Sequence, residues 1–218
     1  MEKNKELQLE VVEELDWDPQ VNAANIGVTV EDGVVTLSGN VSSYFEKVSA
    51  EQAVKRVAGV KAVAEELEVK LPALDQRSDS DIARSVLDAL KWNVAVPEQH
   101  IDVKVEHGWV TLQGEVDWYY QKLAAQGAVE RLAGVKGITN LIFVRPTVSS
   151  AEIKSKIEDA FKRNALLDAE KITINILNGK VSLHGKVQSW QEREQAELAA
   201  TAAPGVREVD NDLKVDLD

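Results

Sequence analysis

The sequence of 218 residues contains no cysteine. Disulfide bonds, thiolate metal sites and cysteine nucleophiles are therefore excluded. No apolar run approaches the roughly 18 residues that a membrane-spanning helix needs, so the chain is not expected to be transmembrane. The N-terminal segment MEKNKELQLE also lacks the apolar centre of a signal peptide. We therefore expect a cytoplasmic protein as the sequence stands, or a periplasmic one if a signal peptide has been removed.

Basic side chains are also scarce, with 25 Lys and Arg against 37 Asp and Glu and a net charge of −12. Such a chain repels phosphate backbones, so nucleic acid is not an expected partner. Anionic membrane surfaces repel it as well, unless a local patch overrides the total charge. The charge is uneven, with net values of −7 for residues 1–71, −2 for 72–147 and −3 for 148–218. The first of these segments is therefore least suited to an anionic surface.

One sequence pattern occurs three times, as DGVVTLSGNV, HGWVTLQGEV and NGKVSLHGKV, and each copy is followed by AGVKAV, AGVKGI or PGVREV. In every copy, 26 residues separate the first glycine of the first pattern from the glycine of the second. The copies recur at 75 and then 71 residues, a period that indicates complete small domains in series rather than a solenoid. We place these domains at residues 1–71, 77–146 and 148–218.

Each copy is predicted to fold in the order α-β-β-α-β. Apolar residues at Leu7, Val11 and Leu15 predict a first helix, and alternating residues from Ile26 to Val30 predict a strand. A two-residue turn joins this strand to the next one in an antiparallel hairpin. The second helix and third strand form a crossover that favours a parallel strand pair. The fold class is therefore α+β: three tandem domains, each a three-stranded mixed sheet with two helices on one face and no extra element in its core.

Residues that end or begin these elements recur as well. Nine glycines occupy three equivalent places in the copies, where they are interpreted as structural turn and helix-cap residues. They are Gly33, Gly39, Gly59, Gly108, Gly114, Gly134, Gly179, Gly185 and Gly205. Capping boxes are predicted for Ser43 with Glu46, Ser149 with Glu152 and Ser189 with Glu192. Asp117 is the predicted cap of the second helix in the middle copy.

These motifs resemble those of the BON domain, a small bacterial unit found in osmotically inducible periplasmic proteins and related chains. The family pattern has an I-x-V-x-V strand, then D/N-G-x-V-x-L-x-G-x-V, then a helix ending in G-V-x-x-V before N-x-L-x-V. The sequence matches it three times, although Glu65 stands in the first copy where the others have Asn140 and Asn211. The resemblance implies association with phospholipid or membranes and a link to osmotic or envelope stress. It implies no catalytic residues, because the motif consists of turn glycines and core aliphatic residues.

No residue pattern in the sequence indicates catalysis, a metal or a cofactor. His100, His107 and His184 align with other residue types in the other copies and are interpreted as exposed surface residues. There is no H-E-x-x-H, nucleophile elbow or acidic calcium loop. We therefore predict a non-enzymatic protein with no catalytic residue, no metal site and no cofactor.

Some aromatic residues recur between copies. Tyr44, Tyr119 and Trp190 share one position at the start of the second helix, which favours a structural role. Trp17 and Trp92 follow the first helix in two copies, and we expect them to cover the edge of the core.

Three further aromatic residues, Trp109, Trp118 and Tyr120, occur in the middle copy alone. Alternation along the strand points Trp109 to the sheet face that the helices leave open. We predict that these three residues form a contact surface, either between the repeats or for a partner.

Two classes of function follow. The first is a non-enzymatic, stress-related binding module that associates with phospholipid or cell-envelope components, as the family resemblance implies. The alternative is a soluble cytoplasmic protein–protein interaction scaffold, favoured by the acidic charge and the missing signal. The candidate partners are therefore phospholipid or another protein. The sequence leaves the oligomeric state and the arrangement of the domains open.

Overall fold

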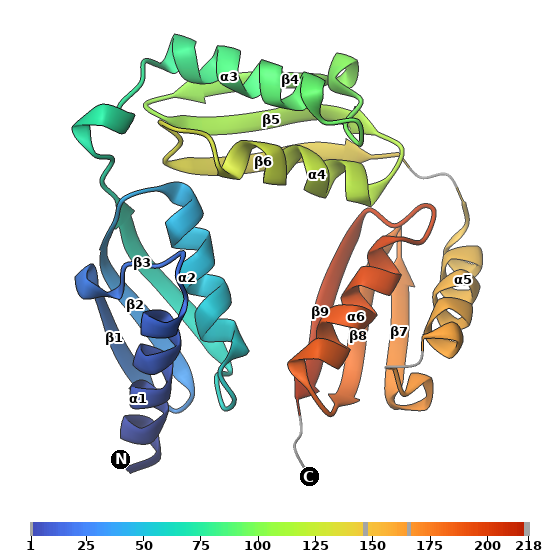
Figure 1. The fold of residues 1–218 in the computed structure, drawn as a ribbon. Helices are drawn as coiled ribbons and strands as arrows, with labels where there is room; N and C mark the ends of the chain where they lie inside the picture. Colours follow the sequence, from blue (N-terminus) through green and yellow to red (C-terminus); the bar gives the residue numbers. More distant parts are fainter. Residues whose placement is uncertain (1, 146–147, 165–166, 216–218) are drawn as a thin grey trace. The chain divides into compact units, whose positions relative to one another are not determined.

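The computed structural model describes residues 2–145, 148–164 and 167–215 (Figure 1). Each of the three repeats has its own three-stranded sheet and two α-helices, so the predicted fold class is confirmed. In these described ranges, no hydrogen-bonded strand pairing joins the sheet of one repeat to that of another. The predicted domain ends at residues 1, 146 and 218 lie outside the described residues.

The three repeats contain the same elements in the same order. Repeat 1 consists of α1 (Glu2–Trp17), β1 (Ile26–Glu31), β2 (Val34–Val41), α2 (Tyr44–Arg56) and β3 (Ala62–Val69). Repeat 2 consists of α3 (Asp79–Trp92), β4 (Ile101–Glu106), β5 (Trp109–Val116), α4 (Tyr119–Glu130) and β6 (Gly137–Val144). Repeat 3 consists of α5 (Ser150–Arg163), β7 (Ile172–Leu177), β8 (Lys180–Val187), α6 (Trp190–Thr201) and β9 (Glu208–Val215).

The central strand of each sheet is the second strand of its repeat. In repeat 1, β1 runs antiparallel to β2 with Val30 opposite Val35, and β3 runs parallel to β2 with Val63 opposite Val35. The hairpin turn begins at Asp32, which has a φ of 50°, and the equivalent His107 and Asn178 have φ values of 53° and 52°. Positive φ at both turn residues matches the right-handed twist of the strands, which explains the tight two-residue hairpin.

The core of each repeat lies between its sheet and its two helices, which cover one face of the sheet (Figure 1). In repeat 1, Val11 and Leu15 of α1 pack with Val35 and Leu37 of β2, and all four are at most 1% exposed. Because side chains alternate along a strand, the residues between them point to the other face of the sheet. This second face, called the open face below, carries the residues that differ most between repeats.

A short 3₁₀ helix precedes the first strand of each repeat, and the expectation of no extra element in the core was wrong. In repeat 1 it spans Ala23–Asn25. The backbone carbonyl of Asn25 packs against Gly39 so closely that a Cβ atom at Gly39 would overlap it. His100 and Lys171 approach Gly114 and Gly185 in the same way. The sequence signal for this turn was therefore the glycine near the end of the central strand that accommodates it.

The N-terminus of α2 is held by a different hydrogen-bond pattern from the predicted capping box. Ser43 Oγ accepts the N–H of Glu46 at 3.0 Å, as expected. The Glu46 carboxylate accepts the N–H of Ser42 at 2.7 Å and that of Asn22 at 2.9 Å, and Glu46 is only 5% exposed. This buried carboxylate therefore ties α2 to the loop before β1. The predicted capping box of Ser149 and Glu152 is present in full.

The same tie recurs in repeat 3, and repeat 2 keeps only the part at the helix start. Glu192 accepts the N–H of Gln188 at 2.7 Å and that of Asp168 at 3.1 Å. In repeat 2 the amide oxygen of Gln121 accepts the N–H of Asp117 at 3.1 Å. The prediction that Asp117 caps this helix was wrong, because the longer Gln121 side chain reaches back to the helix start and takes that role.

Candidate functional site

Trp109 projects from the open face of repeat 2, as alternation predicted. Its side chain is 49% exposed, and its Nε1 donates a hydrogen bond to Thr139 Oγ1 at 2.8 Å. Thr139 lies on the neighbouring strand β6, so this bond joins two strands of the sheet through side chains. The indole is therefore fixed in orientation while half of its surface remains available for contact.

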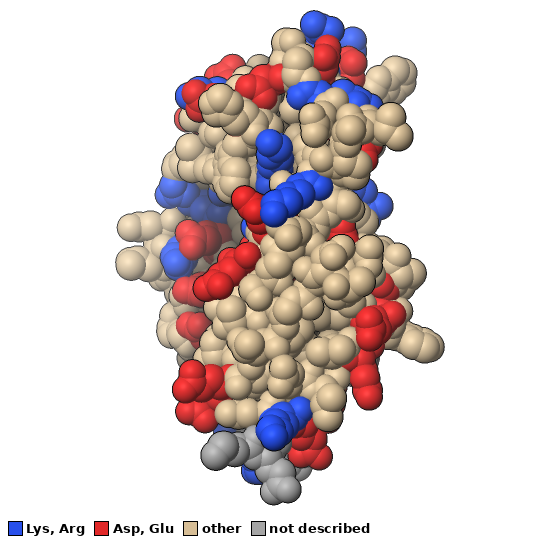
Figure 2. Space-filling view, turned by 90° about the vertical axis from the view of Figure 1, so that its left-hand side faces the viewer, with Lys and Arg blue, Asp and Glu red and all other residues tan. Residues whose placement is uncertain are grey.

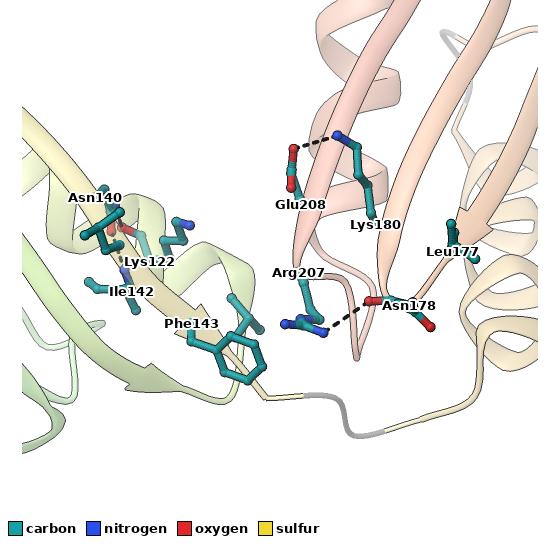
Figure 3. A pocket seen from close by; sticks show the side chains of 11 residues that line it. Lys122, Asn140, Ile142, Phe143, Leu177, Asn178, Lys180, Arg207 and Glu208 are labelled. Atoms are coloured by element: carbon teal, nitrogen blue, oxygen red, sulfur yellow. Dashed lines mark hydrogen bonds and ion pairs between the residues drawn. The ribbon is translucent and has the colours of Figure 1, made fainter.

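The equivalent position on the open face has different chemistry in each repeat. Val34 stands there in repeat 1, opposite Ala62. Lys180 stands there in repeat 3, and its Nζ lies 2.9 Å from Glu208 Oε1 on the adjacent strand (Figure 3). The same backbone register thus presents a small apolar pair, an aromatic ring or an ion pair, so the open faces are not equivalent surfaces.

Trp118 and Tyr120 lie at the opposite end of β5 from Trp109. Their ring centroids are 6.3 Å apart, and the side chains are 36% and 47% exposed. The seven residue steps from Trp109 to Val116 span about 23 Å of strand. Trp118 and Tyr120 therefore form one aromatic pair and Trp109 a separate contact point, so the three residues remain proposed contact residues at two places.

The tryptophans at the ends of the first helices do not cover the core. Trp17 is 83% exposed and Trp92 is 84% exposed, so the expected role at the core edge was wrong. Helix periodicity explains this, because the core-facing residues of α3 end at Leu90, and Trp92 is rotated away from them. Leu87 of the same helix and Val94 just beyond it are also exposed, although Leu87 lies about 140° around the helix from Trp92.

A polar side chain on the last strand of each repeat protects the sheet edge. Asn140 Oδ1 accepts the N–H of Ile142 at 3.2 Å, and its Nδ2 donates to the carbonyl of Lys122 on α4 at 3.0 Å. In repeat 1, Glu65 Oε1 accepts the N–H of Leu67 at 3.1 Å. Glu65, which stands where the family pattern has asparagine, therefore keeps the hydrogen bond at the sheet edge. Sequence reasoning had not assigned this role.

The carboxylate of Glu65 cannot donate a hydrogen bond as an asparagine amide does, and Lys47 supplies a donor instead. Its Nζ lies 3.0 Å from Glu65 Oε1 and donates to the carbonyl of Leu67 at 2.8 Å. Arg193, the equivalent residue of repeat 3, donates through Nε to the carbonyl of Leu213 at 3.1 Å. Each of these side chains covers a carbonyl of the sheet edge.

A groove of about 430 Å³ lies beside the edge of β6 (Figure 3). Asn140 to Val144 form one wall together with Lys122, and Asn178, Lys180, Arg207 and Glu208 contribute to the other. Arg207 Nη1 donates to the carbonyl of Asn178 at 3.3 Å, and its guanidinium carbon lies 4.0 Å from the centre of the Phe143 ring. The charged side chains of the lining are three cations and one carboxylate, whereas the whole chain has a net charge of −12.

The electrostatics of this groove differ from those of the acidic surface elsewhere. Burial lowers the pKa of the Lys122 ammonium. The ion pair with Glu208 raises the pKa of Lys180. Glu208 pairs with Lys180 and its charge also acts on Lys122, so the three cations and one carboxylate of the lining leave a net positive charge that attracts an anion.

Asp79 binds a hairpin turn, an interaction that sequence analysis missed. Its carboxylate accepts the N–H of His107 at 2.8 Å and that of Gly108 at 2.9 Å. The bonds from Gly108 and His107 lower the pKa of the Asp79 carboxyl. Asn4 and Ser150 occupy this position in the other repeats. The carboxylate bond between α3 and the hairpin is therefore specific to repeat 2.

The three histidines are exposed and lie in different places on the repeats. His184 Nδ1 lies 3.5 Å from Asp212 Oδ2 on the open face of repeat 3. Within the described ranges, no group of three or more His, Asp or Glu side chains is arranged to hold a metal ion.

The surface properties bear on possible membrane contact. No helix in the described part of the chain combines the length and apolar character needed to cross a bilayer. On the face shown in Figure 2, a broad area lacks charged side chains, and the basic side chains lie in small separate groups.

Comparisons with known proteins agree with the sequence motifs. The family model described as BON domain matches residues 3–70, 78–146 and 149–216. The osmotically-inducible protein Y of Escherichia coli (strain K12) is 30% identical over 151 residues, which cover 62% of this chain and 72% of that protein.

Two solved structures of CdsD, a structural protein of the type III secretion system of Chlamydia trachomatis, were also matched. The first is 15% identical with a TM-score of 0.27, and the match covers 97% of this chain and 92% of that one. The second, the C-terminal domain of CdsD, is 14% identical with a TM-score of 0.27, and the match covers 96% and 97% of the two chains.

Proposed function

Because the chain belongs to the BON domain family, we propose that it is a non-enzymatic, stress-related binding module that associates with phospholipid of the cell envelope. The relative from Escherichia coli is named for its osmotic induction, which supports a role in osmotic stress. A role in the envelope requires export of the chain, and fractionation of the cells that produce it tests this requirement.

The observation that carries the proposal is the exposure of Trp92 at 84%, together with Leu87 at 53% and Val94, in the repeat of lowest net charge. Tryptophan is favoured at the interface between water and lipid, because its ring is apolar and its N–H is polar. Insertion of the Trp92 side chain between headgroups would bury apolar surface without requiring basic residues. The contact with lipid should therefore be apolar, and it should form although the chain has a net negative charge.

Vesicle co-sedimentation tests this proposal. The full chain should bind vesicles of zwitterionic phosphatidylcholine, and Trp92→Ser should lower the bound fraction several-fold. Trp17→Ser is the matched comparison, because Trp17 is equally exposed at the equivalent position of the most acidic repeat and should matter less. Binding to vesicles with anionic lipid should not increase as the salt concentration falls, since electrostatic repulsion is strongest at low salt.

Absence of vesicle binding at every salt concentration would contradict the lipid proposal. Strong binding that appears only at low salt with anionic lipid would also contradict it, because it would show that a local basic patch makes the contact.

A second candidate function is that of a protein–protein interaction scaffold. The observation that favours it is the open face of repeat 2, where Trp109 is held in place but half-exposed. Leu141 and Phe143 on β6 are 56% and 39% exposed. Aromatic side chains are enriched at protein interfaces because they bury a large area at a small entropic cost. Loss of partner binding in Trp109→Ser, with vesicle binding intact, would favour this function over the first.

A further inference from the structure

The edge strand β6 differs in charge from the edge strands of the other repeats. β3 contains Glu65, Glu66 and Glu68, and β9 contains three acidic residues and one lysine. β6 has the sequence GITNLIFV and carries no charged side chain. Charged residues on an edge strand discourage pairing with another chain, and β6 lacks this protection.

The backbone of β6 is also less covered than the other two edges. Lys47 donates to an edge carbonyl of β3, and Arg193 donates to one of β9. Lys122 is the equivalent residue of repeat 2, but in the described part of the chain it makes no such bond to β6. The Ile142 carbonyl, which corresponds to the Leu67 carbonyl that Lys47 covers, therefore has no side-chain donor from α4.

The orientation of β6 determines which groups face the groove. The N–H of Arg145 bonds to Val116 at the end of β5, so odd-numbered residues direct their backbone groups toward β5. The backbone groups of Asn140, Ile142 and Val144 consequently point away from the sheet. Leu141 and Phe143 place their exposed side chains on the open face beside this edge.

The charge of the groove indicates the class of partner. Glu208 pairs with Lys180 at 2.9 Å and its charge also acts on Lys122, so a lining of three cations and one carboxylate keeps a net positive charge. A groove with a net positive lining attracts an anion, although the whole chain has a net charge of −12. Uncovered strand backbone attracts another extended chain.

We propose that the groove beside β6 binds an extended acidic peptide segment of another protein. The segment pairs with the outward backbone groups of Asn140 and Val144 and with the Ile142 carbonyl as an added strand, while the Ile142 N–H keeps its bond to Asn140 Oδ1. Because its side chains alternate, those on one side lie beside Leu141 and Phe143, and those on the other side reach toward α4 and Lys122. Alternate apolar and acidic residues therefore fit, with a carboxylate at Lys122. This binding does not depend on lipid and goes beyond the proposed association with the envelope.

A peptide fits these features better than a lipid headgroup does. A phosphate could satisfy Lys122 and Arg207, but it would leave the backbone groups of β6 unpaired. The groove volume of about 430 Å³ lies within the range of small-ligand sites and accommodates a short extended segment.

Fluorescence anisotropy with the full chain tests the proposal. The probe is a fluorescein-labelled peptide of alternating valine and glutamate, and the comparison peptide has lysine in place of glutamate. We expect the acidic peptide to bind and the basic peptide not to bind. Affinity should fall as salt is added, because the contact between a carboxylate and Lys122 is screened.

Two variants and two matched controls locate the binding. Lys122→Met should weaken the affinity about tenfold, in keeping with the loss of one charge-assisted contact. Leu141→Ser should weaken it several-fold. Lys91→Met and Leu198→Ser replace an exposed lysine of α3 and an exposed leucine of α6, and both should bind like the unmodified chain.

The proposal is overturned if the acidic peptide fails to bind, if the basic peptide binds equally well, or if Lys122→Met has no effect. It is also overturned if vesicles containing phosphatidylglycerol, but not the peptide, bind in a manner that depends on Lys122, because the groove would then be a headgroup site. Vesicle binding that depends on Trp92 while the peptide fails would leave the proposed function standing and remove this inference alone.

Discussion

The indole ring of Trp109 lies over Gly137 of the neighbouring strand, where a Cβ atom would come within 2.7 Å of Cη2 of the ring. Gly137 is consequently buried although it belongs to the open face. The hydrogen bond from Trp109 to Thr139, two residues further along β6, holds the ring in this position. A glycine on one strand thus provides the space that a tryptophan on the adjacent strand fills.

Gly137→Ala should displace the Trp109 ring. Overpacking of this kind costs about 1–3 kcal/mol, so the melting temperature should fall. The indole N–H resonance of Trp109 should shift as its bond to Thr139 is lost. Gly127→Ala is the control, since Gly127 lies in α4 with nothing within 4 Å of an added Cβ. That substitution should stabilise the helix by about 0.5–1 kcal/mol. Equal melting temperatures for the two variants would contradict the packing described here.

Trp109→Ser distinguishes the two places at which this residue could make contact. Burial of a large aromatic side chain contributes about 2–3 kcal/mol, which is comparable with the stability of one small repeat. Thr139→Ala is the comparison, because it removes the bond that Trp109 makes within repeat 2. A much larger fall in the melting temperature for Trp109→Ser than for Thr139→Ala would place Trp109 in a contact between repeats. A similar fall for both variants, with loss of partner binding in Trp109→Ser, would place it on a functional surface. If neither property changes, Trp109 is not part of a contact surface.

Asn140→Ala should destabilise repeat 2. The variant loses the bond to the Ile142 N–H at 3.2 Å and the bond to the Lys122 carbonyl at 3.0 Å. Hydrogen bonds of this kind contribute about 0.5–1.5 kcal/mol each, so we expect a loss of about 1–3 kcal/mol by urea unfolding. Asn175→Ala, at an exposed position on β7, should have little effect. An equally small effect for both variants would show that the edge bond of Asn140 is unimportant.

Glu46→Ala should destabilise repeat 1 more than Glu46→Gln does. Removal of the carboxylate leaves the N–H groups of Ser42 and Asn22 without their acceptor in a part-buried position. Such unpaired groups cost about 1–3 kcal/mol. Glutamine retains an acceptor oxygen, and repeat 2 already uses Gln121 at the equivalent position. Chemical unfolding of both variants tests the order, and a glutamine variant as unstable as the alanine variant would contradict it.

Stability should decrease in acid partly through Asp18. The hydrogen bond from Arg56 at 2.7 Å, followed by that from the Gln20 N–H at 2.9 Å, lowers the pKa of the Asp18 carboxyl. A pKa that is lower in the folded state than in the unfolded state stabilises the protein at pH values above the unfolded pKa. This contribution is lost as the pH falls through the folded pKa, below about pH 4. Urea unfolding of Asp18→Asn should therefore depend less steeply on pH in this range than the unmodified chain does. Identical pH profiles would contradict the assignment.

The repetition of the sequence was sufficient to predict the order of elements, the strand pairing and the open face. Each of these depends on local chemistry, such as the positive φ of the hairpin residue Asp32 or the alternation from Ile26 to Val30. These constraints act within a few residues and are present in three independent copies. The position of the candidate residue Trp109 on the open face was predicted from the same alternation of side chains along a strand.

The tertiary structure decided what depends on residues far apart in the chain. Glu65 was only a departure from a family pattern until the fold placed Lys47 3.0 Å away, eighteen positions earlier on α2. The exposure of Trp92 depends on where α3 ends relative to the core, since a helix rotates its side chains by about 100° per residue. The groove beside β6 combines Lys122 with Arg207, and no sequence period relates these two residues. Sequence therefore determined the local backbone of this protein, while the packing of helices on sheets decided which side chains meet, because such meetings depend on three-dimensional distance.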